Sequence, residues 1–233
     1  MRYVRFILLL STQLLFSQDL KQTMYGEIFR QDSSLKDRLY IQKEFQVGNF
    51  KNGTFQHIFY NNQNEVKAFE TVEIEESKIK NYDFSIADLG IEASAKELEN
   101  NVLLTKIING KIEQKDIELK GDLVVGPLLP QYILENLNKI KNNEKLFFYI
   151  PYFDLLTLIK MEISKVENNN NLTIEMRLSN PLLSFLLPPV KMILSDTGKI
   201  VKIDGPTILP DPNKPNSKKT VYTEIIYKYG DFK

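Results

Sequence analysis

The stretch Gly121-Asp-Leu-Val-Val-Gly-Pro-Leu-Leu-Pro130 leads into a predicted helix, which is followed by a strongly hydrophobic run from Leu146 to Ile163. Pro127 and Pro130 suit the approach to a helix and its first turn, where a missing N–H has no cost. Apolar side chains then recur at helical spacing and form one stripe, at Tyr132, Ile133, Leu134, Leu137 and Ile140. A helix of about three turns is stabilised mainly by packing. The stretch therefore predicts a sheet and the helix that covers it.

Around this stretch, the chain alternates between apolar and polar residues with the period of two that strands have. The pattern is clearest in Arg38 to Val47 and in Leu172 to Leu178. Val102 to Ile108 and Lys111 to Leu119 flank Asn109-Gly110, which suits a type I′ turn and predicts a hairpin. Further strands are predicted at Thr54 to Tyr60, Glu65 to Ile74, Leu146 to Ile150, Leu155 to Val166, Lys191 to Ser195, Lys199 to Asp204 and Thr220 to Tyr229.

Four segments have less regular patterns. Lys78 to Ser85 reads as a strand, and Ala93 to Glu99 as a helical turn. Pro151 is expected to lie between two paired strands, because proline is disfavoured inside a central strand. Asn180 to Pro189 predicts a short second helix. The fold class is therefore mainly β (α+β): a curved antiparallel sheet or half-barrel of roughly a dozen strands, covered by one central helix and a short second helix.

Composition predicts one exported, β-rich domain. Residues 1–18 have a signal-peptide layout, because Arg2 and Arg5 precede an apolar run, Phe6 to Phe16, that is too short to span a bilayer. The remaining residues, 19–233, are read as a single domain in the periplasm or secreted, with no transmembrane segment after signal cleavage. Basic and acidic residues number 30 each, which gives no reason to expect a nucleic-acid partner. Cysteine is absent, which excludes disulfides and thiolate chemistry.

The sequence gives little sign of catalysis. His57 is the only histidine and alternates with Phe55 and Phe59. It could serve as a general base, but no G-x-S-x-G motif accompanies it, so a structural or surface role is expected. Asp83 and Asp88 lack the pattern of a calcium loop, and Gly121 to Gly126 lacks that of a phosphate loop. We therefore predict no catalytic residues, no metal, no cofactor and no enzymatic activity.

The apolar content around residues 146–156 and 182–187 exceeds what one face of an alternating sheet would bury. Either the sheet and its helices fill the core from both sides, or a concave sheet holds a lipid or another hydrophobic ligand. In the first case the protein is a structural or protein-interaction module of the cell envelope, with an envelope protein as partner. In the second, the predicted ligand contacts are Phe147, Tyr149, Tyr152, Phe153, Phe185 and Leu186.

Four segments carry a family resemblance. They are residues 123–140, which include Leu-Val-Val-Gly-Pro-Leu-Leu-Pro-Gln-Tyr-Ile, the aromatic strand that follows, residues 176–186, Met-Arg-Leu-Ser-Asn-Pro-Leu-Leu-Ser-Phe-Leu, and residues 203–206, Ile-Asp-Gly-Pro. Together they resemble a family of uncharacterised exported bacterial proteins with a signal peptide and a curved antiparallel sheet. The resemblance covers about Gly121 to Pro206 and implies no catalytic residues. It implies an architecture similar to the half-barrel of periplasmic lipoprotein carriers, in which helices cover the concave face of the sheet.

Overall fold

The structure is a computed structural model that describes residues 21–31, 37–166, 172–180, 188–214 and 221–230. Within these residues the chain is mainly β, with fourteen strands in one antiparallel sheet. The strands are β1 (Lys21–Arg30), β2 (Arg38–Gly48), β3 (Gly53–Tyr60), β4 (Val66–Glu75), β5 (Lys78–Ile86), β6 (Ile91–Glu97), β7 (Asn101–Ile108), β8 (Lys111–Glu118), β9 (Leu146–Tyr152), β10 (Thr157–Val166), β11 (Leu172–Leu178), β12 (Val190–Leu194), β13 (Ile200–Thr207) and β14 (Val221–Tyr229).

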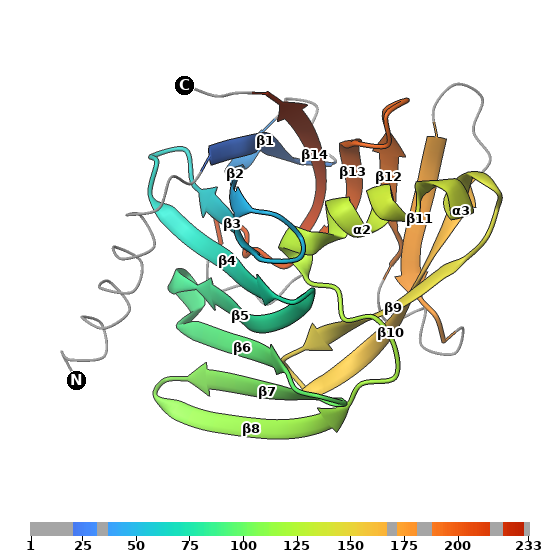
Figure 1. Cartoon of the computed structure of the whole chain (residues 1–233). Helices are drawn as coiled ribbons and strands as arrows, with labels where there is room; N and C mark the ends of the chain where they lie inside the picture. The colour runs from blue at the N-terminus through green and yellow to red at the C-terminus, as the bar shows by residue number, and fades with distance from the viewer. Residues whose placement is uncertain (1–20, 32–36, 167–171, 181–187, 215–220, 231–233) are drawn as a thin grey trace.

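The strand order explains why one segment crosses the sheet. Strands β1 to β8 follow one another towards one end of the sheet, and β9 to β14 run back from the other end. The two halves join where β1 pairs with β14. Because β8 and β9 lie at opposite ends of the sheet, the chain between them, residues 119–145, must cross it. We call these residues the crossover segment; in Figure 1 its helices lie on the inside of the curve of the sheet. That inner side is the concave face.

The crossover segment contains three short helices: η2 (Gly126–Leu128), α2 (Leu129–Glu135) and α3 (Leu137–Lys141). One continuous helix was expected here, but the helix is interrupted at Asn136, which has φ −101° and ψ 12°. The side-chain amide and the backbone N–H of Asn136 both donate to the carbonyl of Tyr132. This local hydrogen bonding competes with regular helix geometry. The predicted second helix lies outside the described residues.

Two other predictions about secondary structure are wrong. The segment expected to form a helical turn, Ala93 to Glu99, is mostly strand β6, in which Ala93 and Ala95 are buried on the concave face. Pairing with β5 and β7 outweighs the weak helix preference of this sequence. Pro151, expected between strands, lies inside β9 and opposite Leu158. A proline is tolerated there because β9 is the last strand of the sheet.

Apart from β1, which the pattern does not predict, the remaining described strands lie in the predicted segments. In β2 the buried face is that of Tyr40 and Gln42 rather than that of Ile41 and Phe45. The hairpin of β7 and β8 turns at Asn109 and Gly110, whose φ angles are 52° and 80°. Both angles are positive, as a type I′ turn requires. The segment Lys78 to Ser85 forms β5, and the two strands predicted on either side of residues 196–198 are β12 and β13, which pair with each other.

The interior of the curved sheet is filled by three groups of buried apolar side chains. The first lies between the crossover helices and β9 to β13, where Ile133 and Ile140 contact residues such as Phe148 and Ile174. The second joins β3 to β7 with Val125 of the crossover segment. The third lies at the other end of the concave face, around Leu39, Phe59 and Leu209. The crossover segment thus contributes to two of the three groups.

The two end strands are protected in different ways. The outer strand β8 is exposed along nearly its whole length and carries charges of both signs, which discourages pairing with other chains. The free side of β9 is partly occupied by the crossover segment: the Val124 N–H donates to the Tyr149 carbonyl at 2.9 Å, and the Tyr149 N–H donates to the Asp122 carbonyl at 2.8 Å.

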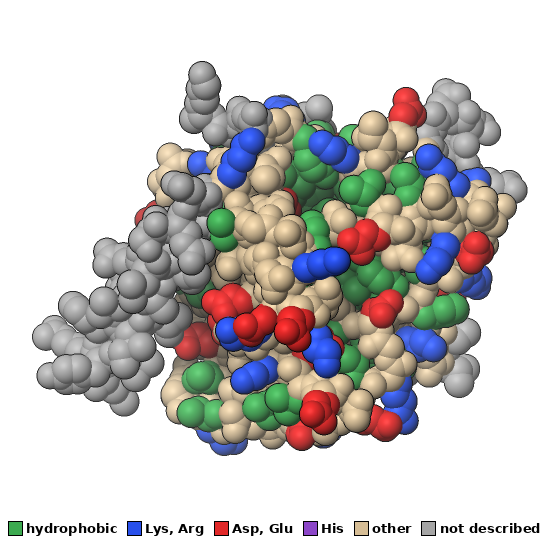
Figure 2. Space-filling view, viewed as in Figure 1, with side chains coloured by type: hydrophobic (Ala, Val, Ile, Leu, Met, Phe, Trp, Pro, Cys, Tyr) green, Lys and Arg blue, Asp and Glu red, His purple; other side chains and the backbone are tan. Residues whose placement is uncertain are grey.

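In the surface of Figure 2, apolar side chains are interrupted by charges of both signs. The described residues include no helix with the length and apolar character needed to cross a membrane.

Candidate functional site

A row of three ionisable side chains lies on the concave face, across three neighbouring strands. In the strand register, His57 of β3 stands opposite Glu44 of β2 and Glu70 of β4. Residues directly opposite each other in antiparallel strands lie on the same face of the sheet. We call Glu44, His57 and Glu70 the charged row.

The two ring nitrogens of His57 each face a carboxylate. His57 Nε2 lies 3.0 Å from Glu44 Oε2, and His57 Nδ1 lies 3.1 Å from Glu70 Oε2. A histidine can donate from both nitrogens only when it is protonated. Burial of His57, which is 5% exposed, would by itself lower its pKa, but the hydrogen bonds and negative charges of the two glutamates outweigh burial and raise the pKa to about 9. His57 is therefore an imidazolium at neutral pH.

Neutral hydroxyl groups occupy the outer oxygens of both carboxylates. Thr23 Oγ1 donates to Glu44 Oε1 at 2.7 Å, and the Tyr82 hydroxyl donates to Glu70 Oε1 at 2.8 Å. Burial, together with the charge of Glu70, raises the pKa of Tyr82 well above its ordinary value, so this hydroxyl keeps its proton. These contacts fix the orientation of both carboxylates.

Two tyrosines of β14 continue the polar region across the centre of the sheet. The Tyr227 hydroxyl donates to Gln42 Oε1 at 3.2 Å, and the Tyr229 hydroxyl donates to the carbonyl of Ile200 at 2.8 Å. Burial raises the pKa of both tyrosines above the usual range. Gly26 of β1 makes room for the Tyr227 ring, because a Cβ at Gly26 would lie 2.8 Å from its Cε1.

The crossover segment meets the charged row at one point. A Cβ added to Gly126 would overlap Glu70 Oε2 and lie 2.9 Å from Glu70 Oε1. The backbone at the start of η2 therefore rests directly on the Glu70 carboxylate, and only glycine fits there without a shift. Val124 and Val125, just before this contact, belong to the first and second apolar groups respectively.

In the charged row, both ring nitrogens and all four carboxylate oxygens have a partner. Both nitrogens of His57 are occupied, so it could accept no further proton without first giving one up. Among the described residues, no cluster of three or more histidine, aspartate or glutamate side chains has the arrangement of a metal site. Two carboxylates and one imidazolium leave one net negative charge in the interior.

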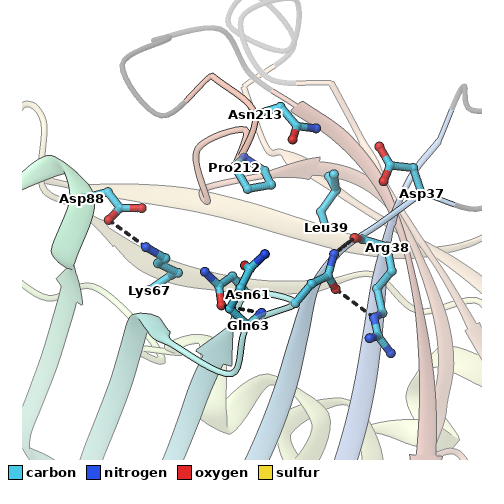
Figure 3. A pocket seen from close by; sticks show the side chains of 10 residues that line it. Asp37, Arg38, Leu39, Asn61, Gln63, Lys67, Asp88, Pro212 and Asn213 are labelled. Atoms are coloured by element: carbon cyan, nitrogen blue, oxygen red, sulfur yellow. Dashed lines mark hydrogen bonds and ion pairs between the residues drawn. The ribbon is translucent and has the colours of Figure 1, made fainter.

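A second polar feature, a cleft of about 410 Å³, lies where β2 begins and β3 turns into β4 (Figure 3). Its charged side chains have partners in the wall of the cleft or beside it, such as Glu27 for Arg38 and Arg30 for Asp37. Lys67 Nζ lies 3.3 Å from Asp88 Oδ1, and Arg38 Nε donates to Asn62 Oδ1 at 3.1 Å. The two basic and two acidic side chains of the lining therefore balance in charge, and none of them is left unpaired to select a ligand. Its wall consists of Asp37, Arg38, Leu39, Asn61, Asn62, Gln63, Lys67, Asp88, Pro212 and Asn213.

The four described residues among the predicted ligand contacts do not all share one face of the sheet. Phe147 and Tyr149 are on the face of β9 opposite to buried Phe148, and Phe147 is 45% exposed, with Lys160 Nζ 4.9 Å from its ring centre. Tyr152 is on the same face of this strand as Phe148, because the two are an even number of residues apart. Phe153 packs in the interior, with its ring centre 6.2 Å from that of Tyr82. Phe185 and Leu186 lie outside the described residues.

The contact between Glu44, His57 and Glu70 is not predicted from the sequence. His57 was expected in a structural or surface role, and the structure buries it between two glutamates. A signal was present: Glu70 lies between Ala68 and Val72 on the apolar face of its strand, as His57 lies between Phe55 and Phe59. A charged residue at an apolar position of an alternating strand is rarely buried without a partner.

Comparisons of the chain with protein-family models, with curated proteins and with solved structures give no match.

Proposed function

We propose that the protein is an exported, non-catalytic binding protein of the periplasm or the cell exterior. In this proposal the curved sheet acts as a half-barrel, and a lipid or another hydrophobic ligand lies on its concave face in the place of the crossover helices. The observation that carries the proposal is the form of the cover: an apolar concave face is closed by helices of only seven and five residues.

The crossover helices are weak as elements of structure. Neither α2 nor α3 has a side-chain hydrogen bond at its N-cap, and Asn136 separates them. Helices this short are marginal without packing, so their stability comes from the apolar face that they cover. A ligand that fills the same apolar face would take the place of these packing contacts and displace the helices.

The free energy gained by burying the crossover side chains is similar to that gained by burying an alkyl chain on the same face. The crossover segment buries four aliphatic side chains: Val124, Val125, Ile133 and Ile140. Burial of one such side chain contributes about 1.5–3 kcal/mol, so together they contribute on the order of 10 kcal/mol. An alkyl chain gains about 0.8 kcal/mol per buried CH₂, so a chain of about twelve methylenes offers a comparable gain.

A second candidate function, a structural or protein-interaction module of the cell envelope, is favoured by a different observation. The three apolar groups fill the interior of the curved sheet in the form described. In that case the crossover segment is a permanent part of the core, and the protein acts through its outer surface.

One experiment separates the two candidates. The protein without residues 1–18 is purified and analysed by native mass spectrometry and lipid extraction, and binding of a fluorescent fatty probe is measured for two variants. Ile140→Ala removes a fully buried side chain from α3, and Leu39→Ala removes one from β2, at the other end of the concave face.

If a ligand displaces the crossover helices, Ile140→Ala binds the probe about tenfold or more tightly than wild type, because the competing cover is weaker. Leu39→Ala, which loses a similar amount of stability, leaves the affinity unchanged. A protein that carries no lipid and binds no probe in any of the three forms supports the filled module instead.

A further inference from the structure

The charged row carries a net negative charge that no basic side chain of the described residues neutralises. His57 supplies one positive charge to Glu44 and Glu70, and the other hydrogen bonds that the described residues donate to the two carboxylates come from the hydroxyls of Thr23 and Tyr82. No lysine or arginine of the described residues forms an ion pair with either glutamate. Buried charges are normally paired, because an unpaired one is costly to desolvate.

The cover over this charge is the crossover segment itself. The backbone of Gly126 rests on both oxygens of Glu70, with no side chain between them. If the crossover segment moves aside, Glu70 is the member of the row that loses its cover. Glu44 is less affected, because its contacts come from Thr23 and His57 of the sheet.

Apolar surface borders the contact between Gly126 and Glu70 on two sides. Val124 and Leu128 of the crossover segment pack against the first apolar group, and Val125 packs with Phe55 in the second. A molecule that takes the place of the crossover segment would therefore meet apolar side chains along most of its length and a carboxylate at one position. That is the pattern of an amphiphile with one polar end.

We propose that the ligand of the concave face is a single-chain amphiphile with a primary ammonium headgroup, and that the Glu70 carboxylate accepts a hydrogen bond from that ammonium. This inference rests on the proposed function, because it requires the crossover segment to be displaced. An ammonium restores the charge balance of the row and forms a charge-assisted hydrogen bond. An anionic headgroup would meet a buried negative charge, and a neutral hydroxyl would leave that charge uncompensated.

The site is prepared for this contact by its neighbours. Tyr82 holds one oxygen of Glu70 and His57 holds the other, so the carboxylate keeps its orientation when the cover is removed. Each carboxylate oxygen has two lone pairs, which leaves acceptor capacity for a further donor. A pre-oriented group loses little conformational entropy on binding.

The test uses three probes that share a twelve-carbon chain: dodecylamine, dodecanol and dodecanoate. Their binding to the protein without residues 1–18 is measured by isothermal titration calorimetry below the micelle concentration. We expect dodecylamine to bind at least about tenfold more tightly than dodecanol, and dodecanoate to bind most weakly.

Three variants identify the contact. Glu70→Gln should reduce the affinity for dodecylamine about tenfold and leave that for dodecanol unchanged. Glu44→Gln disturbs His57 to a similar degree but keeps the Glu70 carboxylate, so its effect should be smaller. Glu73→Gln, on the same strand but outside the row, is the matched control and should bind all probes like wild type. Circular dichroism and urea unfolding establish that each variant is folded.

The outcomes separate the two proposals. If none of the three probes binds, the proposed hydrophobic ligand is wrong, and this inference falls with it. If all three bind with equal affinity, the proposed function stands and the ammonium headgroup is refuted. If dodecylamine is preferred but Glu70→Gln leaves that preference intact, the contact with Glu70 is wrong.

Discussion

The two halves of the sheet use the concave face differently. In β9 to β13 it is apolar, and its side chains pack against α2 and α3. In β2 to β5 the same face carries Glu44, His57 and Glu70 in hydrogen-bonded contact, surrounded by apolar residues. Packing in the first half depends on volume and shape, whereas the second half depends on an exact strand register. One sheet thus provides an apolar surface and a fixed charge beside it, and the proposed amphiphile depends on both.

The largest expected effect comes from removing the centre of the charged row. His57→Ala leaves two buried carboxylates without their shared cation, and we expect a loss of about 3–5 kcal/mol in the free energy of unfolding. Urea denaturation measures it. A triple variant that replaces Glu44, His57 and Glu70 with glutamine removes all the charges together and should be more stable than His57→Ala. If His57→Ala lowers the free energy of unfolding by less than about 1 kcal/mol, the charged row does not hold β2, β3 and β4 together.

A pH titration sharpens the comparison between the halves. The pKa of His57 is raised from 6.5 to about 9 by Glu44 and Glu70, against the opposing effect of burial. A raised pKa in the folded state stabilises the protein fully below about pH 6.5, and this contribution is lost as the pH rises through about 9. Wild type should therefore lose on the order of 3 kcal/mol over this range.

The same titration on two variants supplies the controls. Ile174→Ala removes a buried side chain from the apolar half and should lower stability equally at every pH. His57→Gln removes the titrating group and should flatten the profile. If His57→Gln keeps the wild-type pH dependence, another group is responsible for it.

A smaller effect is expected where the crossover segment touches the row. Gly126→Ala places a Cβ against the Glu70 carboxylate, and the forced shift should cost about 2 kcal/mol in the free energy of unfolding. At Gly121 the nearest atom to an added Cβ is Tyr149 Cε2, at 3.3 Å, so Gly121→Ala should change stability much less. In a Glu70→Ala background the cost of Gly126→Ala should largely disappear. Equal costs in both backgrounds would contradict the contact.

The smallest effect concerns the break between α2 and α3. Asn136→Ala removes the side chain that hydrogen-bonds the Tyr132 carbonyl and introduces a stronger helix former. We expect a gain of about 0.5 kcal/mol in unfolding free energy and, if a ligand displaces these helices, weaker binding of a fatty probe. Asn138→Ala, within α3, is the control for helix propensity alone. Thermal melts and probe titrations measure both variants, and an identical response from the two would show that the break at Asn136 has no special effect.

Much of the strand arrangement could be predicted from the sequence, because alternation with period two marks segments such as β2 and β11. In β2, however, the buried face is that of Tyr40 and Gln42, because it carries polar contacts to other parts of the chain. The hairpin at Asn109 and Gly110 was also predictable, since the turn needs positive φ angles. The strand β6 was not, because its short alanine-rich sequence fits a helix equally well and only its pairing with β5 and β7 decides the outcome.

The candidate site was much less predictable. Glu44, His57 and Glu70 are spaced thirteen residues apart, and they meet only because the β2–β3 and β3–β4 turns set the register. Inserting or deleting one residue in either turn would shift the register, so that His57 and the glutamate of the neighbouring strand would lie on opposite faces of the sheet. The predicted ligand contacts follow from hydrophobicity alone, which does not distinguish the two faces of β9.

The pairing of β1 with β14 has a consequence for how the chain is made. These strands are the first and last of the described residues, yet they are neighbours in the middle of the sheet. Contacts between residues some two hundred positions apart form slowly, because the intervening loop must close first. Until β14 has been synthesised, the nascent chain carries β1 as an unpaired edge, so a chaperone that shields this edge would protect the protein from aggregation before the sheet can be completed.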